Sequence, residues 1–549
     1  MVGESSSRPR AEARGWALCL ALALSAAPVC AQTQPAARTA AAGTTAAAER
    51  RLDILEFKVT GSRVLKPIEV EEAVYPFLGP QRSLDDVEKA RAALEEVYNA
   101  KGYQTVSVQI PPQQGTGGII TLAVVEGEVG RLRVRGSRYF SLDAIKEQAP
   151  SLAEGTVPNF NDISRDIVAL NQLPDRRVTP TLRAGTKPGT IDVDLNVEDK
   201  LPLHGSLELN NRYSANTKPL RLTGTLRYDN LWQLGHSLST SFQVAPERPD
   251  DAKVFSASYM ARVPDVTWLS FLLYGMKQDS DVSTLGGINV AGRGEVVGLR
   301  AIFTLPSEAE FFHSVSAGID YKHFDEGVTL GGGTLTTPIT YYPFTATYTA
   351  MWSDDGAQTQ LNAGTTFHLR GMGSDGKEFD NKRTFANENF IYVRGDLSHT
   401  RELPEGLQIH GKLGGQVADQ ALVSNEQFSV GGAETVRGYL ESEALGDNGA
   451  FASIELRSPS VVSWFASEDV TRLVEEWRFH VFAEAGIAEV IDALAEQESS
   501  FHLASIGVGT RVRLMEHLHG ALDVALPFID QSSTQAYDPR VHFRLWAEY

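Results

Sequence analysis

One arginine stands out in a segment whose composition is unusual for a loop. The segment from Phe428 to Tyr439 reads FSVGGAETVRGY, and Arg437 is its only basic residue. It lies in a stretch of roughly thirty residues between two runs of alternating apolar and polar residues, far longer than a hairpin loop. Its apolar side chains are not those of a solvated linker. We therefore predict that the segment folds against the protein and that Arg437 meets an anionic group there.

The candidate partner is a carboxylate in a later run of alternating residues. In one predicted strand the apolar side chains fall on one face and Glu484 falls on the other, so Glu484 faces the lumen if this strand belongs to a membrane barrel. The next predicted strand places Gly507, Gly509 and Arg511 on the same inner face, and the two glycines leave space for an incoming loop. Two interpretations stay open: Arg437 and Glu484 form a bidentate ion pair, or both charges line a wet pore.

Other chemistry finds little support in the sequence. There is no Gly-x-Ser-x-Gly elbow, no His-Glu-x-x-His motif and no phosphate-binding glycine loop between a strand and a helix. The histidines are scattered without metal-ligand spacing. The net charge of −19 argues against a nucleic-acid partner, because the phosphate backbone would be repelled. We expect no catalytic residue, no metal site and no cofactor.

Residues 1–31 are typical of a secretory signal peptide. Three arginines precede an apolar run from Trp16 to Ala27, and small residues lead to a predicted cleavage after Ala31. The run is too short for a membrane anchor. Both cysteines, Cys19 and Cys30, lie in this segment, so the mature chain has none, and its net charge moves from −19 to −20 because three arginines and two glutamates are removed. Residues 32–51 are rich in alanine and predict a flexible leader.

An internal repeat follows the leader. Val59-Thr-Gly-Ser-Arg63 recurs as Val134-Arg-Gly-Ser-Arg138, 75 residues later (134 − 59), and each copy follows a strand-like run. The repeat predicts two related soluble units, residues 52–128 and 129–200. Each has the order strand, helix, helix, strand, strand.

Capping residues mark a helix in each unit. In the first unit Ser83 and Asp86 form a capping-box pattern before residues with helical periodicity. In the second unit Asn161 is the expected cap, and Pro174 is the expected stop. These signals predict one well-defined amphipathic helix in each unit.

From residue 201 to residue 549 helical periodicity nearly disappears. In its place come segments of roughly ten residues with alternating hydrophobicity, the pattern of an outer-membrane barrel. No apolar run after the signal is long enough for a spanning helix, so a barrel is the fold that would place this chain in a membrane. A secreted β-sandwich would not need so many strands. We predict sixteen antiparallel strands, which begin near Leu203, Leu220, Ser237, Val254, Trp268, Glu295, His313, Thr340, Gln360, Phe390, Leu407, Ala450, Trp477, His502, Leu518 and Arg540.

Two such units before a sixteen-stranded barrel resemble the outer-membrane two-partner secretion transporters, the TpsB family, whose periplasmic units are called POTRA domains. Val436, Arg437, Gly438 and Tyr439 look like the tip motif of that family's sixth extracellular loop, which folds into the barrel. By strand count the motif lies between strands eleven and twelve, where the family carries it. The resemblance also rests on residues 102–113, 125–127, 170–174 and 185–189, and it implies POTRA 1 at 52–128, POTRA 2 at 129–200, a transmembrane barrel at 201–549 and loop 6 at about 419–447.

The chain departs from the family pattern in two places. The family's strand-thirteen motif, which pairs with the loop arginine, is usually Phe-x-Asp-x-Gly, and here it reads Phe482-Ala-Glu484-Ala-Gly486. The carboxylate is kept but is one methylene longer, so the resemblance implies a pair with Arg437 in a shifted geometry. Many members also begin with a helix that plugs the pore, and the short Ala-rich leader predicts that this chain lacks a full plug.

The resemblance implies a non-enzymatic outer-membrane pore with its N-terminal domains in the periplasm. Such a pore recognises an unfolded exoprotein through its POTRA domains and secretes it to the cell surface, with loop 6 as the moving part. The implied partners are one TpsA-like exoprotein and outer-membrane lipid, and we expect a monomer. Two alternatives remain: a barrel-assembly factor of the same superfamily, which typically has more POTRA units, and a passive porin, which would need no periplasmic units.

Overall fold

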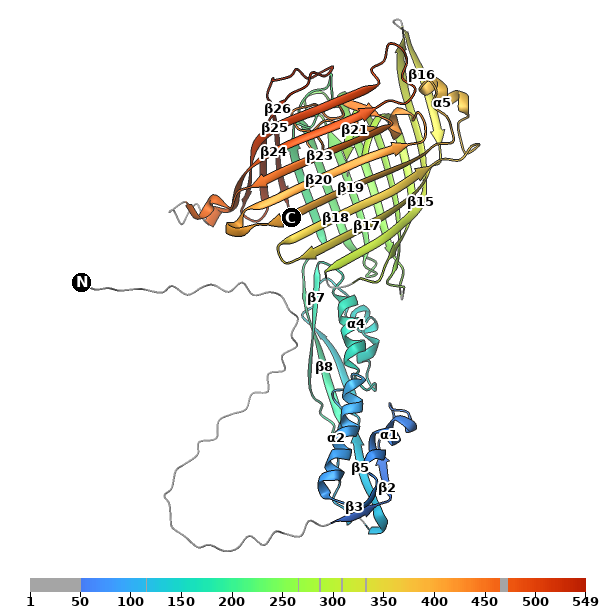
Figure 1. The fold of residues 1–549 in the computed structure, drawn as a ribbon, viewed down its shortest axis with the longest axis vertical. Helices are drawn as coiled ribbons and strands as arrows, with labels where there is room; N and C mark the ends of the chain where they lie inside the picture. The colour runs from blue at the N-terminus through green and yellow to red at the C-terminus, as the bar shows by residue number, and fades with distance from the viewer. Residues whose placement is uncertain are drawn as a thin grey trace, which may run out of the picture.

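The computed structural model describes residues 51–549 except 115, 265, 286–287, 308–309, 331–332 and 465–471. The predicted signal peptide and residues 32–50 of the predicted leader lie outside the described residues. Two small α+β units form a stalk below a large closed barrel (Figure 1). In the part of the chain that the structure describes, no helix is long and apolar enough to cross a bilayer.

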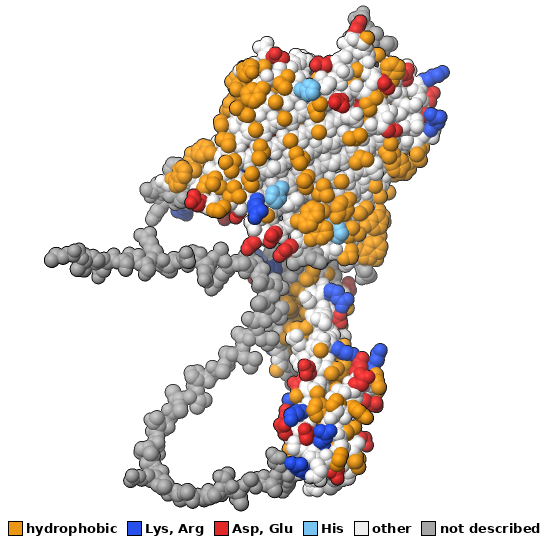
Figure 2. Space-filling view, viewed as in Figure 1, with side chains coloured by type: hydrophobic (Ala, Val, Ile, Leu, Met, Phe, Trp, Pro, Cys, Tyr) orange, Lys and Arg blue, Asp and Glu red, His pale blue; other side chains and the backbone are white. Residues whose placement is uncertain are grey.

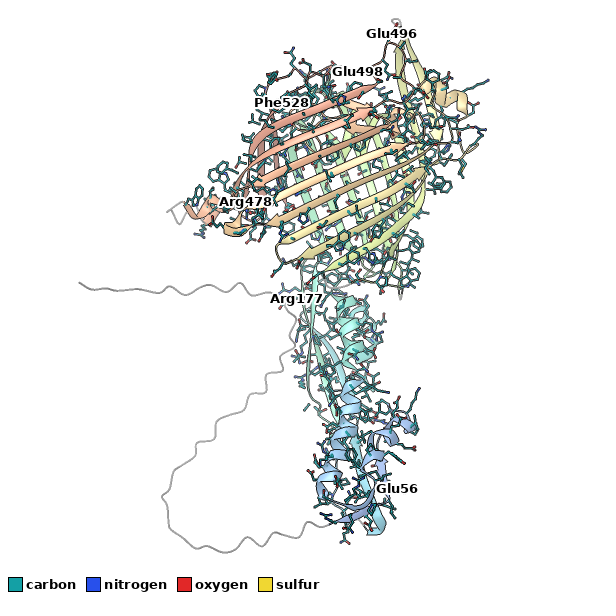
Figure 3. The ribbon with its side chains drawn as sticks, viewed as in Figure 1. Glu56, Arg177, Arg478, Glu496, Glu498 and Phe528 are labelled. Carbon is teal, nitrogen blue, oxygen red and sulfur yellow. The ribbon has the colours of Figure 1, made fainter. Side chains whose placement is uncertain are left out.

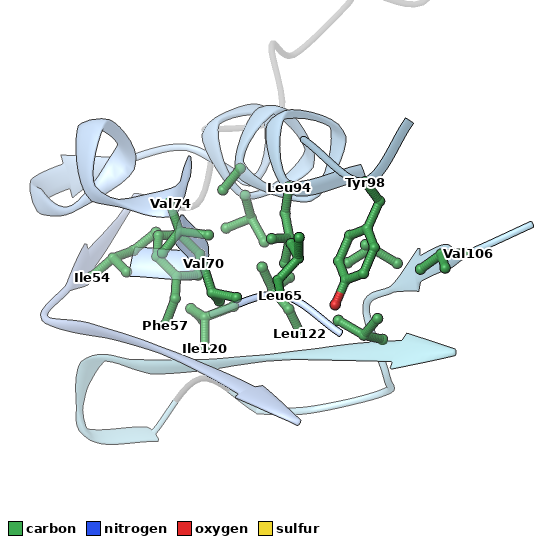
Figure 4. Packing of buried hydrophobic residues seen from close by; sticks show 14 residues of the cluster. Ile54, Phe57, Leu65, Val70, Val74, Leu94, Tyr98, Val106, Ile120 and Leu122 are labelled. Atoms are coloured by element: carbon green, nitrogen blue, oxygen red, sulfur yellow. The ribbon is translucent and has the colours of Figure 1, made fainter. Parts of the chain in front are cut away.

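The first unit of the stalk packs two α-helices on a three-stranded sheet. Its elements are β1 (Leu52–Ile54), β2 (Glu56–Thr60), α1 (Pro67–Val74), η1 (Tyr75–Phe77), β3 (Gly79–Arg82), α2 (Leu84–Ala100), β4 (Ser107–Gln109), η2 (Thr116–Gly118) and β5 (Ile119–Val125). The sheet order is β2-β5-β4, with β2 parallel to β5, and β1 pairs with β3. Helix α2 buries Leu94 and Tyr98 against Leu122 of β5 (Figure 4). As predicted, Ser83 caps α2, and Asp86 completes the capping box.

The second unit repeats this topology. Its elements are β6 (Glu128–Arg135), α3 (Leu142–Glu147), η3 (Pro150–Leu152), α4 (Phe160–Leu170), β7 (Arg176–Ala184) and β8 (Thr190–Asp199). The sheet order is β6-β8-β7, with β6 parallel to β8. The predicted cap Asn161 is wrong, because the Asn159 side chain accepts the hydrogen bond from the Asn161 N–H at 3.0 Å and Asn161 already lies in the first turn. Helix α4 ends at Leu170, four residues before Pro174.

The internal repeat marks the same turn in both units. Gly61 and Gly136 have φ of +84° and +88°, and a Cβ there would lie 2.3 and 2.4 Å from the carbonyl oxygen of the neighbouring strand, so only glycine fits. A carboxylate at the end of that strand then holds the turn. The Glu126 carboxylate accepts from the Arg63 N–H at 2.8 Å, and the Asp199 carboxylate accepts from the Arg138 N–H at 2.8 Å.

Direct contacts join the stalk to the barrel. The Gln233 side chain accepts from the Ser141 N–H at 2.8 Å and donates to the Tyr139 carbonyl at 3.2 Å. A hydrogen bond of 2.9 Å joins His204 to Asp175. The turn between β10 and β11 and the start of β9 are therefore bonded to the second stalk unit.

The barrel has sixteen strand positions, which confirms the predicted number. β16 and β17 occupy one position, since both pair with β15, and β27 closes on β9. All sixteen predicted starts fall within or just before a strand. The strands are β9 (Leu203–Asn210), β10 (Arg221–Leu231), β11 (His236–Val244), β12 (Ala252–Arg262), β13 (Leu269–Leu285), β14 (Ile288–Thr304), β15 (Phe311–Leu330), β16 (Gly333–Tyr341), β17 (Phe344–Asp354), β18 (Ala357–Phe367), β19 (Ile391–Glu402), β20 (Gln408–Ala418), β23 (Asn448–Arg457), β24 (Val474–Glu489), β25 (Ser500–Leu514), β26 (Leu518–Pro527) and β27 (Arg540–Glu548).

The connections at the two barrel ends contain the remaining short elements. These are η4 (Pro249–Asp251), α5 (Gly376–Lys382), η5 (Pro404–Gly406), η6 (Ser424–Glu426), β21 (Phe428–Val430), β22 (Ala444–Gly446) and η7 (Val461–Trp464). Hydrophobic side chains cover the outer wall of the barrel (Figure 2). Along β11, for example, Leu238 and Phe242 are exposed on this wall and Gln243 is buried. The wall is the apolar band that a bilayer requires.

Candidate functional site

The segment between β20 and β23, residues 419–447, returns into the barrel lumen. Both strands meet this segment at the barrel end away from the stalk, the end at which Figure 3 labels Glu496 and Glu498. Within it β21 pairs with β22. Val430, Val436 and Tyr439 are fully buried in a cluster with Phe451 of β23 and Leu503 of β25. This packing explains why the segment is too apolar for a solvated loop.

Arg437 lies at the innermost part of this segment and is enclosed by acidic side chains. Its Nε and Nη2 donate to Oε1 of Glu484 at 2.9 and 2.7 Å. Nη2 also donates to Glu455 at 3.0 Å, and Nη1 donates to Asp523 at 3.3 Å. The guanidinium carbon lies 3.4 Å from the centroid of the Phe482 ring. We call Arg437 and these three carboxylates the tip anchor.

The bond between Arg437 and Glu484 differs from a simple bidentate pair. Both guanidinium donors meet one carboxylate oxygen, Oε1, which also accepts from the Ser453 hydroxyl at 2.9 Å. The second oxygen, Oε2, accepts from the backbone N–H of Arg437 at 2.6 Å. Only about 4% of the Glu484 side chain is exposed. One carboxylate therefore holds both the side chain and the backbone of the loop.

The other two carboxylates of the tip anchor have further side-chain partners. Glu455 binds Arg457 at 2.6 Å and Arg511 at 3.1 Å. Asp523 binds His480 at 2.7 Å. Sequence reasoning missed Glu455 and Asp523. Each lies on the inner face of its strand, so the alternation of apolar and polar residues along β23 and β26 could have identified both as lumen-facing.

The inner-face glycines make space for different groups. A Cβ at Gly486 would lie 2.4 Å from Val430 Cγ1, so Gly486 makes room for the loop. A Cβ at Gly507 would lie 2.2 Å from the Phe482 ring, and one at Gly509 would lie 2.0 Å from Asp523. The prediction that Gly507 and Gly509 admit the loop is therefore wrong, because side chains of neighbouring strands fill that space.

The motif residues beside Arg437 also contact the wall. The Gly438 N–H donates to His542 Nε2 at 3.0 Å. The Tyr439 hydroxyl lies 3.1 Å from the carbonyl oxygens of Ala504 and Ile529. Four consecutive residues, with Val436 in the apolar cluster, are thus bound to β24, β25, β27 and the end of β26.

A second set of buried carboxylates holds the loop near the far end of the barrel. Glu426 accepts from Lys322 at 2.5 Å, from the Tyr341 hydroxyl at 2.6 Å and from the Tyr392 hydroxyl at 2.8 Å. Asp447 is completely buried and accepts from Arg383 Nη2 at 2.7 Å. We call Glu426 and Asp447 with these partners the outer anchor. Sequence reasoning missed it, because its partners come from strands and a loop remote in sequence.

One group of side chains has the composition of a metal site. Among the described residues, ligand atoms of Asp175, His204 and Asp229 lie within 4.8 Å of one another. However, His204 is hydrogen-bonded to Asp175, and Arg227 binds Asp229 at 2.7 Å. These contacts give the group protein partners, and the His204–Asp175 hydrogen bond joins the barrel to the stalk.

Two protein-family models match the chain. The model described as haemolysin secretion/activation protein ShlB/FhaC/HecB matches residues 189–512, more than half of the 549 residues. The chain belongs to the ShlB/FhaC/HecB family. A model of the ShlB-type POTRA domain matches residues 52–127. The protein is therefore a TpsB-type outer-membrane transporter with N-terminal POTRA domains on the periplasmic side, and the far end of its barrel is extracellular.

Individual ShlB/FhaC/HecB relatives agree with this assignment. Outer membrane transporter CdiB of Dickeya dadantii (strain 3937) is 24% identical over 410 residues, 69% of this chain and 67% of the relative. Heme/hemopexin transporter protein HuxB of Haemophilus influenzae (strain 86-028NP) is 21% identical over 391 residues, 69% of this chain and 67% of the relative. The structure of CdiB from Escherichia coli matches with a TM-score of 0.61 at 19% identity and covers 93% of both chains. This structural match shows a shared fold.

Proposed function

We propose that this transporter moves one unfolded exoprotein from the periplasm to the cell surface through the barrel lumen. The observation that carries the proposal is the tip anchor, which binds an extracellular loop inside the lumen of a barrel that follows two POTRA units. A passive porin needs neither the units nor a loop fastened by buried ion pairs. Together with the domain boundaries at 128 and 200, this architecture supports a protein-conducting pore that acts as a monomer.

Recognition of the exoprotein is assigned to the free edges of the POTRA sheets. β7 pairs only with β8, and β6 pairs only with β8, so each exposes one edge to solvent. An extended segment of the client gains main-chain hydrogen bonds when it adds to such an edge. Pro180 in β7 has no N–H to offer and fits an edge strand. This mode of binding requires little side-chain specificity and suits an unfolded client.

The tip anchor is assigned the task of keeping loop 6 in its docked position. Arg437 is about 6% exposed, and removing one member of a buried ion pair costs about 3–5 kcal/mol because the other charge is left uncompensated. A docked loop 6 blocks the part of the lumen beside β24 to β26. The functional motif is therefore Val436 to Tyr439 with Phe482, Glu484 and Gly486.

The barrel fold by itself also suits a factor that inserts other barrels. The structure of BamA from Haemophilus ducreyi matches with a TM-score of 0.54 at 12% identity and covers 91% of this chain. Family membership favours secretion over insertion, because the description of the matching family concerns secretion and activation of haemolysin.

Deletion of the gene in its own bacterium tests the proposal. Proteomics of the medium and cell surface should show the loss of one large secreted protein, and a plasmid copy of the transporter should restore it. An unchanged set of secreted proteins, combined with loss of barrels from the outer membrane, would support the insertion factor instead.

A further inference from the structure

The lumen contains a cavity on the side away from the tip anchor. Its volume is about 900 Å³, and it is bounded on one side by β10 to β13 and on the other by loop 6, including Phe428, Ser429 and Thr435. An extended chain occupies about 150 Å³ per residue, from a rise of ~3.3 Å, a strand spacing of ~4.7 Å and a sheet spacing of ~10 Å. The cavity therefore has room for about six extended residues while loop 6 is docked.

The wall opposite loop 6 is lined by small hydroxyl side chains. On β11 Ser239 and Ser241 line the cavity, whereas Leu238 and Phe242, which flank this pair in the sequence, are exposed on the lipid side. The Ser241 hydroxyl is 2.7 Å from that of Ser256 on β12. We call this surface the hydroxyl patch, and its members are Thr223, Thr225, Ser239, Ser241, Ser256 and Ser258.

The charges around the cavity are already partnered. Glu434 of loop 6 binds Arg212 at 2.5 Å and Lys412 at 3.5 Å. The remaining charged lining residues have polar partners as well: Arg544 binds Glu208 at 2.7 Å, Asn362 donates to Asp396 at 3.0 Å, Arg394 donates to Gln416 at 2.7 Å, and the Ala433 N–H donates to Glu441 at 3.0 Å. β10 to β13 contribute no charged side chain to the described lining, and the charged side chains on the other sides of the cavity have ionic or neutral hydrogen-bond partners.

These properties match the needs of an unfolded polypeptide in transit. Such a chain has one N–H and one C=O per residue to satisfy, and a hydroxyl can both donate and accept. Conduction requires contacts that are favourable enough to enter and weak enough to leave. Rotatable hydroxyls on a wall to which β10 to β13 contribute no charged side chain meet both conditions for any client sequence.

We propose that the exported polypeptide crosses the lumen in extended form along the hydroxyl patch, between β10 to β12 and a loop 6 that stays docked. This inference rests on the proposed function and adds to it the path of the exported chain through the lumen. It differs from the expectation that loop 6 must leave the lumen, because the cavity beside the docked loop has the volume of about six extended residues.

Single cysteines test the path, since the sequence has no cysteine after Cys30. Ser241→Cys places a thiol in the hydroxyl patch. Ser505→Cys places one opposite Glu484 on β25, where Ser505 is about 2% exposed while loop 6 is docked. Thr240→Cys is the control on the lipid side of β11. Each variant is treated with a charged, water-soluble thiol reagent in permeabilised cells, with and without a jammed client.

The client used is the protein whose secretion is lost when the transporter gene is deleted, fused to a fast-folding domain that stalls it in the pore. Labelling of the Ser241→Cys variant should fall about tenfold if nine in ten transporters hold a client, because the reagent reaches only the unoccupied fraction. The Ser505→Cys and Thr240→Cys variants should stay unlabelled with or without client. Labelling at position 505 upon jamming, or unchanged labelling at position 241, would overturn the proposal. If deletion removes no secreted protein, the proposed function fails first, and the two failures are distinguishable.

Bulky side chains give a second test that does not depend on a jammed client. Ser241→Trp places an indole ring in the cavity, and secretion should fall at least about tenfold, because the ring takes space that the exported chain would occupy. Thr240→Trp, its neighbour on the lipid side, should secrete like the wild type. Heat-modifiable migration shows that both barrels are folded. Normal secretion by a folded Ser241→Trp barrel would contradict the proposal.

Discussion

Loop 6 is held at two places by opposite arrangements of charge. At the tip anchor one cation, Arg437, lies among three carboxylates, whereas at the outer anchor single carboxylates, Glu426 and Asp447, lie among cations and phenols. Loss of the tip anchor would leave the loop tethered near the cell surface, and loss of the outer anchor would leave its tip in the lumen. The tip anchor therefore determines where the tip of loop 6 lies, and the outer anchor stabilises the rest of the loop.

The largest effect should come from removing the cation of the tip anchor. Arg437→Ala leaves the buried Glu484 with no cationic partner among the described residues, at a cost of about 3–5 kcal/mol to loop docking, so the barrel should insert but secrete poorly. Secretion is measured by immunoblotting of the medium at equal transporter abundance. Arg513→Ala is the matched control, because Arg513 is 45% exposed and its partner Glu475 is 30% exposed, and such a pair contributes about 0–1 kcal/mol. Equal secretion by both variants would show that the buried pair of Arg437 matters no more for secretion than an exposed pair.

The next effect should come from overfilling the space beneath the loop. In Gly486→Ala the new methyl group would meet Val430 Cγ1 at 2.4 Å and Val436 Cγ2 at 3.1 Å, and overpacking of this kind costs about 1–3 kcal/mol. Protease nicking of loop 6 in intact cells should therefore increase. Gly411→Ala on β20 is the control, since its nearest neighbour would be 4.0 Å away. If both variants are nicked like the wild type, the packing of the tip is less restrictive than the structure indicates.

A smaller effect is expected from neutralising the outer anchor. Glu426→Gln preserves the shape of the side chain but loses the charge that faces Lys322, and hydrogen bonds to charged groups contribute about 1.5–3 kcal/mol. The melting temperature of the barrel should fall, while Arg437 stays in contact with Glu484. Glu434→Gln is the comparison, because the Glu434 side chain is 56% exposed and should matter little. If Glu434→Gln lowered the melting temperature more than Glu426→Gln does, Glu426 would not be the carboxylate that stabilises the loop.

The smallest effect concerns Asp199 of the second stalk unit, a carboxylate that accepts hydrogen bonds from backbone N–H groups. Burial raises the pKa of Asp199. The hydrogen bonds from the N–H groups of Tyr139 and Arg138 lower it by more than burial raises it, so the pKa is below its usual value. Its stabilisation is therefore present above the unfolded pKa of about 3.9 and is lost as the pH falls through the folded value. The exchange protection of the Tyr139 amide should decrease in that range, and Asp199→Asn should abolish the dependence. A pH-independent protection factor in the wild type would contradict this.

The sequence predicts the architecture of the barrel more completely than it predicts the residues around Arg437. Sixteen strands follow from alternation with period two, and the same alternation placed Glu484 on the lumen face. The alternation places Glu455 and Asp523 on the lumen face as well. Which of these charged residues contact Arg437 depends on the path of the loop, and alternation does not predict that path. The helix cap was misplaced because Asn159 and Asn161 are equally good caps by residue type. The outer anchor could not be predicted, since its groups come from distant parts of the chain and share no local pattern.

A double-mutant cycle on Arg437 and Glu484 tests the central claim, that their contact keeps loop 6 in the lumen. In a background with Ser505→Cys, the labelling of the new thiol by a water-soluble reagent reports how often the loop leaves. We expect Arg437→Ala, Glu484→Ala and the double variant to expose this thiol to about the same extent, since coupled residues give non-additive effects of about 0.5–3 kcal/mol. Additive effects of the two substitutions, or a thiol that stays unlabelled in all three variants, would contradict it.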